Sequence, residues 1–370
     1  MNDTTGGGIL LLLAGAVSGG FALPMMTGAF GGALLSILAG ALNGSFAAPT
    51  KIARKWRWEN IWSVWAVWAM LILPWALVFA TIPHAIPFFE NTPANQWSLL
   101  ILFGMGFGLA QIFFGLGIAA VGIALNFAIA IGISTAFGSI VPFLSQHADR
   151  LFTREGLFLF VGILLMLAGI VVSAVAGRKK ERYLSMAMAK TANLAEKRMS
   201  FAAGLTLCVL AGLGSPLGNF GAAFCTPTLH RAVETGASPV WQYNVIWAPL
   251  YTASLVPYLI YCLYLWRKNR SFGLFAAAGS GVNWVYGFIM AALWMGSSAI
   301  YGVAMARIGK MGPVLGWPLF MSVIIVVSSA WGFVTGEWKG AGKEAVRFMI
   351  LAIALLIVGF CTLAYSSTLG

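Results

Sequence analysis

Long runs without a charged side chain are the feature that most constrains how this sequence can fold. A helix needs about 20 apolar residues to cross a bilayer. The runs 4–50 and 91–148 can each hold two such spans, with breaks near Pro24–Gly32 and Gly117–Gly122. Seven further runs hold one span each, so the sequence predicts eleven membrane-spanning segments. These single-span runs are 60–89, 156–177, 199–230, 235–266, 271–306, 311–336 and 348–370.

Composition agrees with a membrane protein and excludes several other classes. The chain is 60% apolar and 9% charged, whereas soluble domains are about 25% charged. The runs are continuously apolar and lack the two-residue alternation of barrel strands, so we predict an all-α polytopic protein in the lipid bilayer. The net charge of +12 comes from short clusters between apolar runs. No nucleic-acid partner is expected, because that would need a soluble basic face.

The cations are divided unevenly between the two sides of the membrane. Threading the spans from the one that ends near Pro49 places 17 Lys and Arg on one side and 5 on the other. The positive-inside rule therefore assigns the 17-cation side to the cytoplasm. The cluster in KIARKWRWEN, residues 51–60, is interpreted as a cytoplasmic anchor, with Trp56 and Trp58 at the depth of the lipid headgroups.

A charged segment divides the chain into two hydrophobic halves of similar length. Residues 178–199 are interpreted as a basic cytoplasmic linker. Five spans precede the linker, in residues 29–177, and five follow it, in residues 200–370. Because five is odd, the second half must enter the bilayer in the opposite orientation to the first. We therefore predict a ten-helix core built from two inverted five-helix repeats.

Two internal similarities bear on this organisation. LSILAGALNG, near the start of the first half, resembles LCVLAGLGSP, near the start of the second. More sharply, LLLAGAVSGGFALPM at 11–25 matches SILAGALNGSFAAPT at 36–50, with eight of fifteen positions identical. We predict that residues 1–28 form an extra N-terminal helix that places the N-terminus in the cytoplasm. The alternative is that translation effectively starts at Met25 or Met26.

The polar residues inside the spans favour an uncharged substrate. Asp, Glu, Lys and Arg do not occur deep inside any span, and such residues usually mark ion pathways. Amides and hydroxyls both donate and accept hydrogen bonds, and aromatic faces stack on C–H-rich surfaces, so the set suits a neutral sugar. The alternative is that these residues join helices. The predicted substrate-binding residues are Asn43, Gln111, Asn126, Tyr243, Asn244, Trp294, Ser297 and Tyr301. Ser134, Asn219, Tyr258, Asn283 and Ser298 are further intramembrane polar residues.

Glu59 is the carboxylate nearest to the membrane and has two interpretations. The structural one is an interfacial Glu at a helix N-terminus, favoured by the helix dipole and paired with Arg54, Lys55 or Arg57. The functional one is a proton-coupling carboxylate whose protonation follows substrate binding.

The sequence holds little that an enzyme would need. GMGFGLAQ at 104–111 fails the nucleotide-binding pattern at its last position, and no strand precedes it, so close helix packing explains its glycines better. The four cysteines show no metal-ligand spacing. We therefore predict a protein that is not an enzyme and has no cofactor and no bound metal.

Four segments carry a resemblance to a known family: APTKIARKWRWENIWSVWAVWAMLILPWAL at 48–77, FGMGFGLAQIFFGLGIAAVGIALNFAIAIGIS at 103–134, ALWMGSSAIYGVAMARIG at 292–309 and TGEWKGAGK at 335–343. In order, over about residues 29–368, they resemble the bacterial L-rhamnose–proton symporters of the drug/metabolite transporter superfamily. The resemblance implies ten helices in two inverted repeats with both termini periplasmic. It also implies location in the bacterial inner membrane and uptake of L-rhamnose with protons.

Some positions depart from the family pattern and others match it. Gln111 stands where the family has an amide of a different length, Asn126 where a glycine is expected, and Ser297 where a longer amide is expected. These departures lie in the spans that would hold the sugar, and they leave the physiological sugar open. The residues that match are Glu59, Trp294 and Tyr301.

The resulting hypothesis is a secondary active transporter that imports a neutral sugar, L-rhamnose or a related 6-deoxy sugar, together with protons. The two halves would alternate access to a midplane site. The nearest alternative is a facilitator or exporter of another small metabolite. A third is a non-transporting scaffold or receptor subunit, which would be favoured if the intramembrane polar residues faced one another across helix interfaces with no cavity between them.

Overall fold

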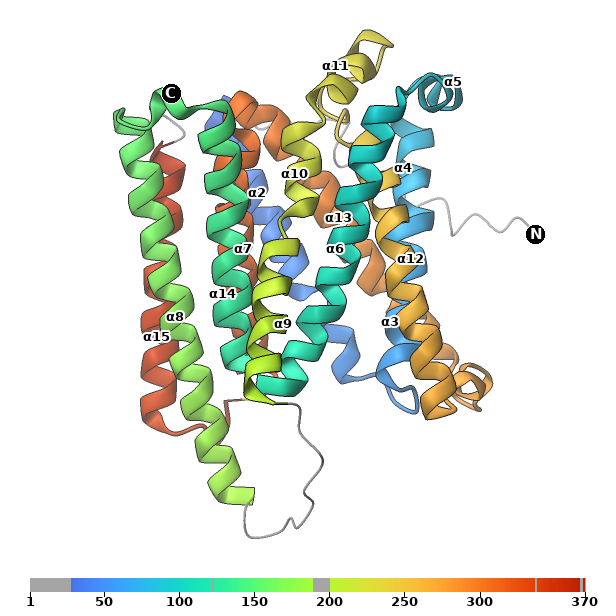
Figure 1. The fold of residues 1–370 in the computed structure, drawn as a ribbon. Coiled ribbons are helices and arrows are strands. Elements are labelled where there is room, and N and C mark those ends of the chain that lie inside the picture. Colours follow the sequence, from blue (N-terminus) through green and yellow to red (C-terminus); the bar gives the residue numbers. More distant parts are fainter. Residues whose placement is uncertain (1–27, 122, 189–199, 337, 367–368, 370) are drawn as a thin grey trace, which may run out of the picture.

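The regular secondary structure is entirely helical throughout the part of the chain that the structure describes (Figure 1). The predicted extra helix at 1–28 lies outside the described residues, except for Gly28, where the first described helix begins. The computed structural model describes residues 28–121, 123–188, 200–336, 338–366 and 369.

The α-helices range from 6 to 35 residues in length. Three of the short ones are α5 (Ala85–Glu90), α10 (Leu217–Phe224) and α11 (Thr226–Glu234). The others are α2 (Gly28–Ser45), α3 (Trp58–Val67), α4 (Leu73–Thr81), α6 (Ala94–Val121), α7 (Ile123–Gln146), α8 (Arg154–Met188), α9 (Phe201–Gly214), α12 (Asn244–Asn269), α13 (Gly281–Ile308), α14 (Gly312–Val334) and α15 (Lys343–Ser366).

The described residues hold nine candidate membrane spans, one of which contains two long helices. Nine stretches are long and apolar enough to span a bilayer, and one of them, Gly281–Val334, has 54 residues. At 1.5 Å per residue this stretch is far longer than the roughly 30 Å of hydrocarbon. It contains α13 and α14, joined by a short turn at Gly309–Met311, so each of these helices crosses separately. The chain is therefore a multi-pass membrane protein.

Two of the crossings are broken. The first runs through α3 and α4, which are joined by a π-helical turn at Trp68–Ile72. Pro74, near the start of α4, cannot donate a backbone hydrogen bond, and this explains the irregular turn before it. The second break lies between α9 and α10, where Pro216 follows Gly214. Broken helices expose backbone groups inside the bundle, as they do at transporter binding sites.

Glycines allow the closest helix pairs. A Cβ atom placed on Gly104 of α6 would overlap the carbonyl oxygen of Leu250 in α12, and one on Gly108 would overlap that of Ser254. Ser254 Oγ also donates to the Gly104 carbonyl at 2.8 Å. The prediction that GMGFGLAQ serves helix packing is therefore confirmed.

The cation clusters gather at one end of the bundle. The start of α3, the end of α8, the end of α12 and the start of α15 all lie there, at the bottom of Figure 1. Lys179 of α8 pairs with Glu344 of α15 at 2.5 Å, and Lys51 donates to Thr335 Oγ1 at 2.9 Å. The first part of the predicted linker, up to Met188, continues α8, and residues 189–199 lie outside the described residues.

Candidate functional site

Three buried aromatic rings from three helices meet inside the bundle. Trp65 comes from α3, Tyr251 from α12 and Trp294 from α13. The rings of Tyr251 and Trp294 are 4.7 Å apart between centroids, and Trp65 meets Trp294 edge-on at 5.4 Å. These helices come from both sides of the central charged segment, so the rings join the two halves.

The rings continue along α12 and across to α14. Trp247 stacks nearly parallel on Tyr251 at 5.6 Å, with 9° between the ring planes. Tyr301 of α13 lies 6.5 Å from Trp247 and stacks on Phe320 of α14 at 4.8 Å. Together with Tyr243, which stacks on Trp247 at 6.3 Å, we call this set the aromatic column: Trp65, Tyr243, Trp247, Tyr251, Trp294, Tyr301 and Phe320.

Polar side chains pair across helices beside the aromatic column. Asn43 Nδ2 of α2 donates to Ser297 Oγ of α13 at 3.1 Å, so the structure brings these two predicted residues together. The Tyr251 hydroxyl donates to Ser298 Oγ at 3.1 Å. Ser297 and Ser298 are both buried, and their hydroxyls can exchange these partners for those of a ligand.

Asn219 is a member of this site that was not among the predicted substrate-binding residues. Its Oδ1 accepts a hydrogen bond from the Tyr301 hydroxyl at 2.8 Å. Its Nδ2 donates to the carbonyls of Gly138 and Pro313, both at 3.0 Å. Asn219 thus ties α10 to α7, α13 and the start of α14. In the sequence, the Gly-Ser-Pro at 214–216 could have indicated this residue, because it ends α9 just before the buried helix α10 that carries Asn219.

Two buried indole N–H groups in the aromatic column lack a protein partner. Nε1 of Trp65 and Nε1 of Trp247 have no hydrogen-bond acceptor among the described residues. Trp317, by contrast, donates its Nε1–H to the Ser134 carbonyl at 2.9 Å. An unpaired buried donor is costly, and a ligand hydroxyl that accepted from Trp65 or Trp247 would break no hydrogen bond among the described residues.

The remaining predicted residues lie elsewhere. Asn244, at the start of α12, donates to Thr81 Oγ1 at 2.9 Å, and Gln111 is half-buried on α6. Asn126 of α7 is fully buried, and neither atom of its amide has a partner among the described residues. It packs so closely on Gly117 of α6 that a Cβ on that glycine would overlap its Oδ1.

Glu59 is buried and holds the end of α12. Its Oε1 accepts hydrogen bonds from Ser271 Oγ at 2.6 Å and from Asn269 Nδ2 at 2.9 Å. Trp266 Nε1 also donates to the Glu59 carbonyl at 3.3 Å. Among the described residues, the side chains that donate to the carboxylate are therefore Ser271 and Asn269, while the neighbouring Arg57 acts on it through its charge. Only 3% of Glu59 is exposed, and burial calls for two donors of this kind.

More hydrogen bonds join the same two chain segments around Glu59. We call residues 54–60 together with 266–283 the inner clasp. Within it, Trp56 Nε1 donates to the Leu274 carbonyl at 2.9 Å, and Asn283 Nδ2 donates to the Arg54 carbonyl at 2.7 Å. Asn60 Nδ2 donates to the Ser271 carbonyl at 3.0 Å, and Lys55 donates to the Ala278 carbonyl.

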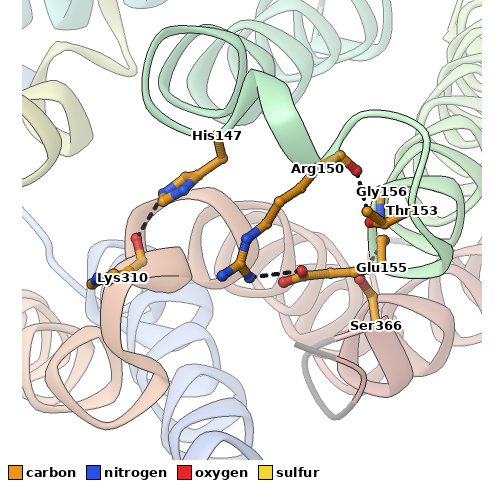
Figure 2. A network of polar contacts seen from close by, with 7 residues as sticks. All are labelled: His147, Arg150, Thr153, Glu155, Gly156, Lys310 and Ser366. Atoms are coloured by element: carbon orange, nitrogen blue, oxygen red, sulfur yellow. Dashed lines mark hydrogen bonds and ion pairs between the residues drawn. The ribbon is translucent and has the colours of Figure 1, made fainter.

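A second polar network lies at the opposite end of the bundle (Figure 2). Arg150 pairs with Glu155 at 2.8 Å, and Glu155 is buried at the start of α8. Ser366 Oγ, at the end of α15, donates to the Glu155 carbonyl at 2.8 Å. His147 Nε2 lies 3.2 Å from the Lys310 carbonyl, between α7 and the α13–α14 turn. We call these residues the outer network.

Comparison with known proteins places the chain in a family. The family model described as the L-rhamnose-proton symport protein (RhaT) matches residues 26–366. The chain belongs to the RhaT family. This match includes every helix of the aromatic column, the inner clasp and the outer network.

Individual relatives have low sequence identity to the chain but align over most of its length. L-rhamnose-proton symporters of Escherichia coli strains K12 / DH10B and O9:H4 (strain HS) are each 26% identical to the chain over 315 residues. The symporter of Escherichia coli O17:K52:H18 is 25% identical. Each alignment covers 83% of this chain and 89% of the relative. The resemblance read from the sequence is confirmed, and so is the prediction of a transporter rather than an enzyme.

Proposed function

We propose that this RhaT family member imports a neutral sugar together with protons by alternating access, with L-rhamnose as the first candidate substrate. The aromatic column carries the proposal, because it combines stacked rings with unpartnered N–H groups at Trp65 and Trp247. The names of the relatives, which are L-rhamnose-proton symporters, support the choice of sugar. A related 6-deoxy sugar would use the same chemistry.

Sugar binding would exploit both parts of the site. The C–H-rich face of a pyranose or its methyl group packs on Trp294 and Trp247, as apolar surfaces do on aromatic rings. Its hydroxyls accept from the two free indole N–H groups. They also replace the bonds that Asn43 and Tyr251 make with Ser297 and Ser298 in this conformation. Because of this exchange, the side chains of Asn43, Tyr251, Ser297 and Ser298 have hydrogen-bond partners both with and without sugar.

Matching helix contacts support two inverted five-helix repeats, residues 29–177 and 200–370. In the first half, α2 contacts α13 and α14; in the second, α9 contacts α6 and α7. Likewise α3 contacts α13 and α12 contacts α6, while α8 and α15 pair with each other. Taken in order, α2, α3, α6, α7 and α8 of the first half correspond to α9, α12, α13, α14 and α15 of the second. Each contact named above then has its counterpart in the other half, as a two-fold relation between the halves requires.

Proton coupling is assigned to Glu59. Its carboxylate joins α3 of one half to the end of α12 in the other, within the inner clasp. A protonated carboxyl has less acceptor capacity than a carboxylate. Protonation would therefore weaken the bonds from Asn269 and Ser271 and loosen the inner clasp. By the positive-inside rule, this cation-rich end would lie on the cytoplasmic side of the bacterial inner membrane.

One observation favours a second candidate, a non-transporting membrane scaffold. Asn43 with Ser297, Tyr251 with Ser298 and Tyr301 with Asn219 all face one another across helix interfaces. Polar pairs of this kind also hold static bundles together. Membership of a transporter family favours the first candidate.

The deciding experiment is uptake of labelled L-rhamnose into proteoliposomes, with and without an imposed inward proton gradient. We expect accumulation driven by the gradient and blocked by unlabelled L-rhamnose. Equilibration without accumulation would point to a facilitator. Absence of uptake for L-rhamnose and for a panel of 6-deoxy sugars would favour the scaffold.

A further inference from the structure

The segment TGEWKGAGK at 335–343 is not used by the proposed transport cycle, and its described residues, 335–336 and 338–343, lie in turns and at the start of α15 at the cation-rich end of the bundle. Gly336, Gly340 and Gly342 have φ angles of 78°, 80° and 79°, which favour glycine. Tyr183 of α8 packs on Gly342, so that a Cβ there would lie 2.8 Å from its ring. The shape of the turn is therefore set by its glycines and by contact with α8.

A surface pocket of about 460 Å³ opens on this turn. The turn and the first residues of α15 line it, with Trp338, Lys343 and Arg347 as its large side chains. Lys343 and Arg347 are four residues apart on α15, so they lie on the same face of the helix. The indole of Trp338 stacks on Phe333 at 5.0 Å.

Further cations surround the pocket. Lys180 of α8 lies 4.9 Å above the ring of Trp338, and Lys179 lies 5.1 Å from the ring of Phe348 while pairing with Glu344. By sequence, residues 178–183 and 336–347 carry seven Lys and Arg against three Glu. One of those three, Glu337, lies outside the described residues. The surroundings of the pocket are therefore strongly cationic.

The pocket lies at the end of an apolar face that points away from the bundle. The α8 and α15 helices pack side by side at one edge (Figure 1). Their outer side chains are exposed, among them Leu164, Val171, Ile350 and Leu351. In a bilayer such side chains contact lipid tails. Ile350 follows Arg347 by three residues, so the cations of the pocket adjoin the lipid-facing surface.

We propose that this pocket binds the phosphate headgroup of an anionic glycerophospholipid. Lys343 and Arg347 donate to the phosphate oxygens, Arg347 in the bidentate manner that guanidinium groups favour. The acyl chains follow the exposed face of α8 and α15, and Trp338 sits at headgroup depth. Basic pockets beside membrane helices recognise anionic headgroups by this chemistry. Free phosphate offers the same anion but has no tails for the adjoining apolar face.

The experiment is native mass spectrometry of the full chain in detergent, titrated with phosphatidylglycerol or phosphatidylcholine of equal chain length. We expect phosphatidylglycerol to bind more tightly. Lys343→Gln and Arg347→Gln should each lower its affinity about fivefold, and the double variant about 25-fold. The control is Arg154→Gln with Lys310→Gln, which removes two cations at the opposite end and should leave binding unchanged.

Several results would overturn the proposal. Equal binding of the two lipids by the unaltered chain would remove the preference for an anionic headgroup. An equal loss of lipid affinity in the control variant would show that binding depends on the net charge of the protein and not on this pocket. Displacement of the lipid by millimolar inorganic phosphate would identify a site for a free anion. Lys343→Arg keeps the charge and leaves Arg347 in place, so it should retain binding, and a loss there would count against the site.

Discussion

At the scale of single residues, the polar groups of the bundle core divide into partnered and unpartnered ones. Trp317 Nε1 has a backbone acceptor, whereas Nε1 of Trp65 and of Trp247 have none among the described residues. A partnered donor contributes to stability, while an unpartnered one costs stability. Replacement by phenylalanine should therefore destabilise the protein more at Trp317 than at Trp247.

Trp247→Phe keeps an aromatic ring, removes the unpartnered N–H and leaves a smaller ring in a buried position. We expect the KM for sugar to rise about threefold to tenfold, the loss of one hydrogen bond, and the unfolding temperature to fall less than in Trp317→Phe. The matched control is Trp317→Phe, which loses the same ring volume and also the hydrogen bond to the Ser134 carbonyl, so it should cost about 0.5–1.5 kcal/mol more stability than Trp247→Phe. Uptake kinetics and thermal unfolding measure both, and an unchanged KM in Trp247→Phe would remove this indole from the site.

Glu59→Gln keeps the shape of the side chain and removes its ability to lose a proton. We expect proton-driven accumulation to be abolished while exchange of labelled for unlabelled sugar continues. Glu155→Gln is the control, because it changes a buried carboxylate at the other end of the bundle and should leave coupling intact. Accumulation at the unaltered level in Glu59→Gln would contradict the assigned role.

At the scale of elements, glycines determine which helices can pack closely against each other. Breaks in the helices lie beside polar groups inside the bundle. The α6–α12 contact depends on Gly104 and Gly108, whereas a Cβ atom placed on Gly115 of α6 would meet no other atom within 4 Å among the described residues. The break at Trp68–Ile72 follows the buried Trp65, and the break before α10 precedes the buried Asn219. A packing glycine and an open one can therefore be compared on one helix.

Gly104→Ala should destabilise the protein by about 1–3 kcal/mol, because the new methyl group overlaps the backbone of α12. Gly115→Ala should be neutral or stabilise it by up to about 1 kcal/mol, since alanine favours the helix and meets open space. Thermal unfolding of both variants in the same detergent makes the comparison. Similar unfolding temperatures for the two would show that the contact is less close than described.

At the scale of the whole molecule, bonds join the two halves at both ends. The inner clasp links residues 54–60 to 266–283, and the outer network links His147 to Lys310. Alternating access requires that each end separate in turn. Covalent closure of either end should therefore stop transport.

Cross-linking between substituted cysteines tests this requirement. We expect a bifunctional thiol reagent to block uptake in Lys55→Cys with Ala278→Cys, and equally in His147→Cys with Lys310→Cys. Reduction should restore uptake for linkers containing a disulfide. Cys361, which is exposed, would be replaced by Ser in all variants, and single-cysteine variants serve as controls. Full transport with one end cross-linked would exclude motion at that end.

The sequence by itself determined the membrane class, the helical spans after residue 28 and the family, because charge-free length and local motifs need no partner. It also singled out Glu59, Trp294 and Tyr301. Only the tertiary structure decided which residues meet. Asn43 meets Ser297 at a separation of 254 residues, Asn219 becomes the partner of Tyr301, and Glu59 accepts hydrogen bonds from Asn269 and Ser271, which are 210 and 212 residues away. The physical reason is that buried polar groups take partners brought together by helix packing, and packing is not local in sequence.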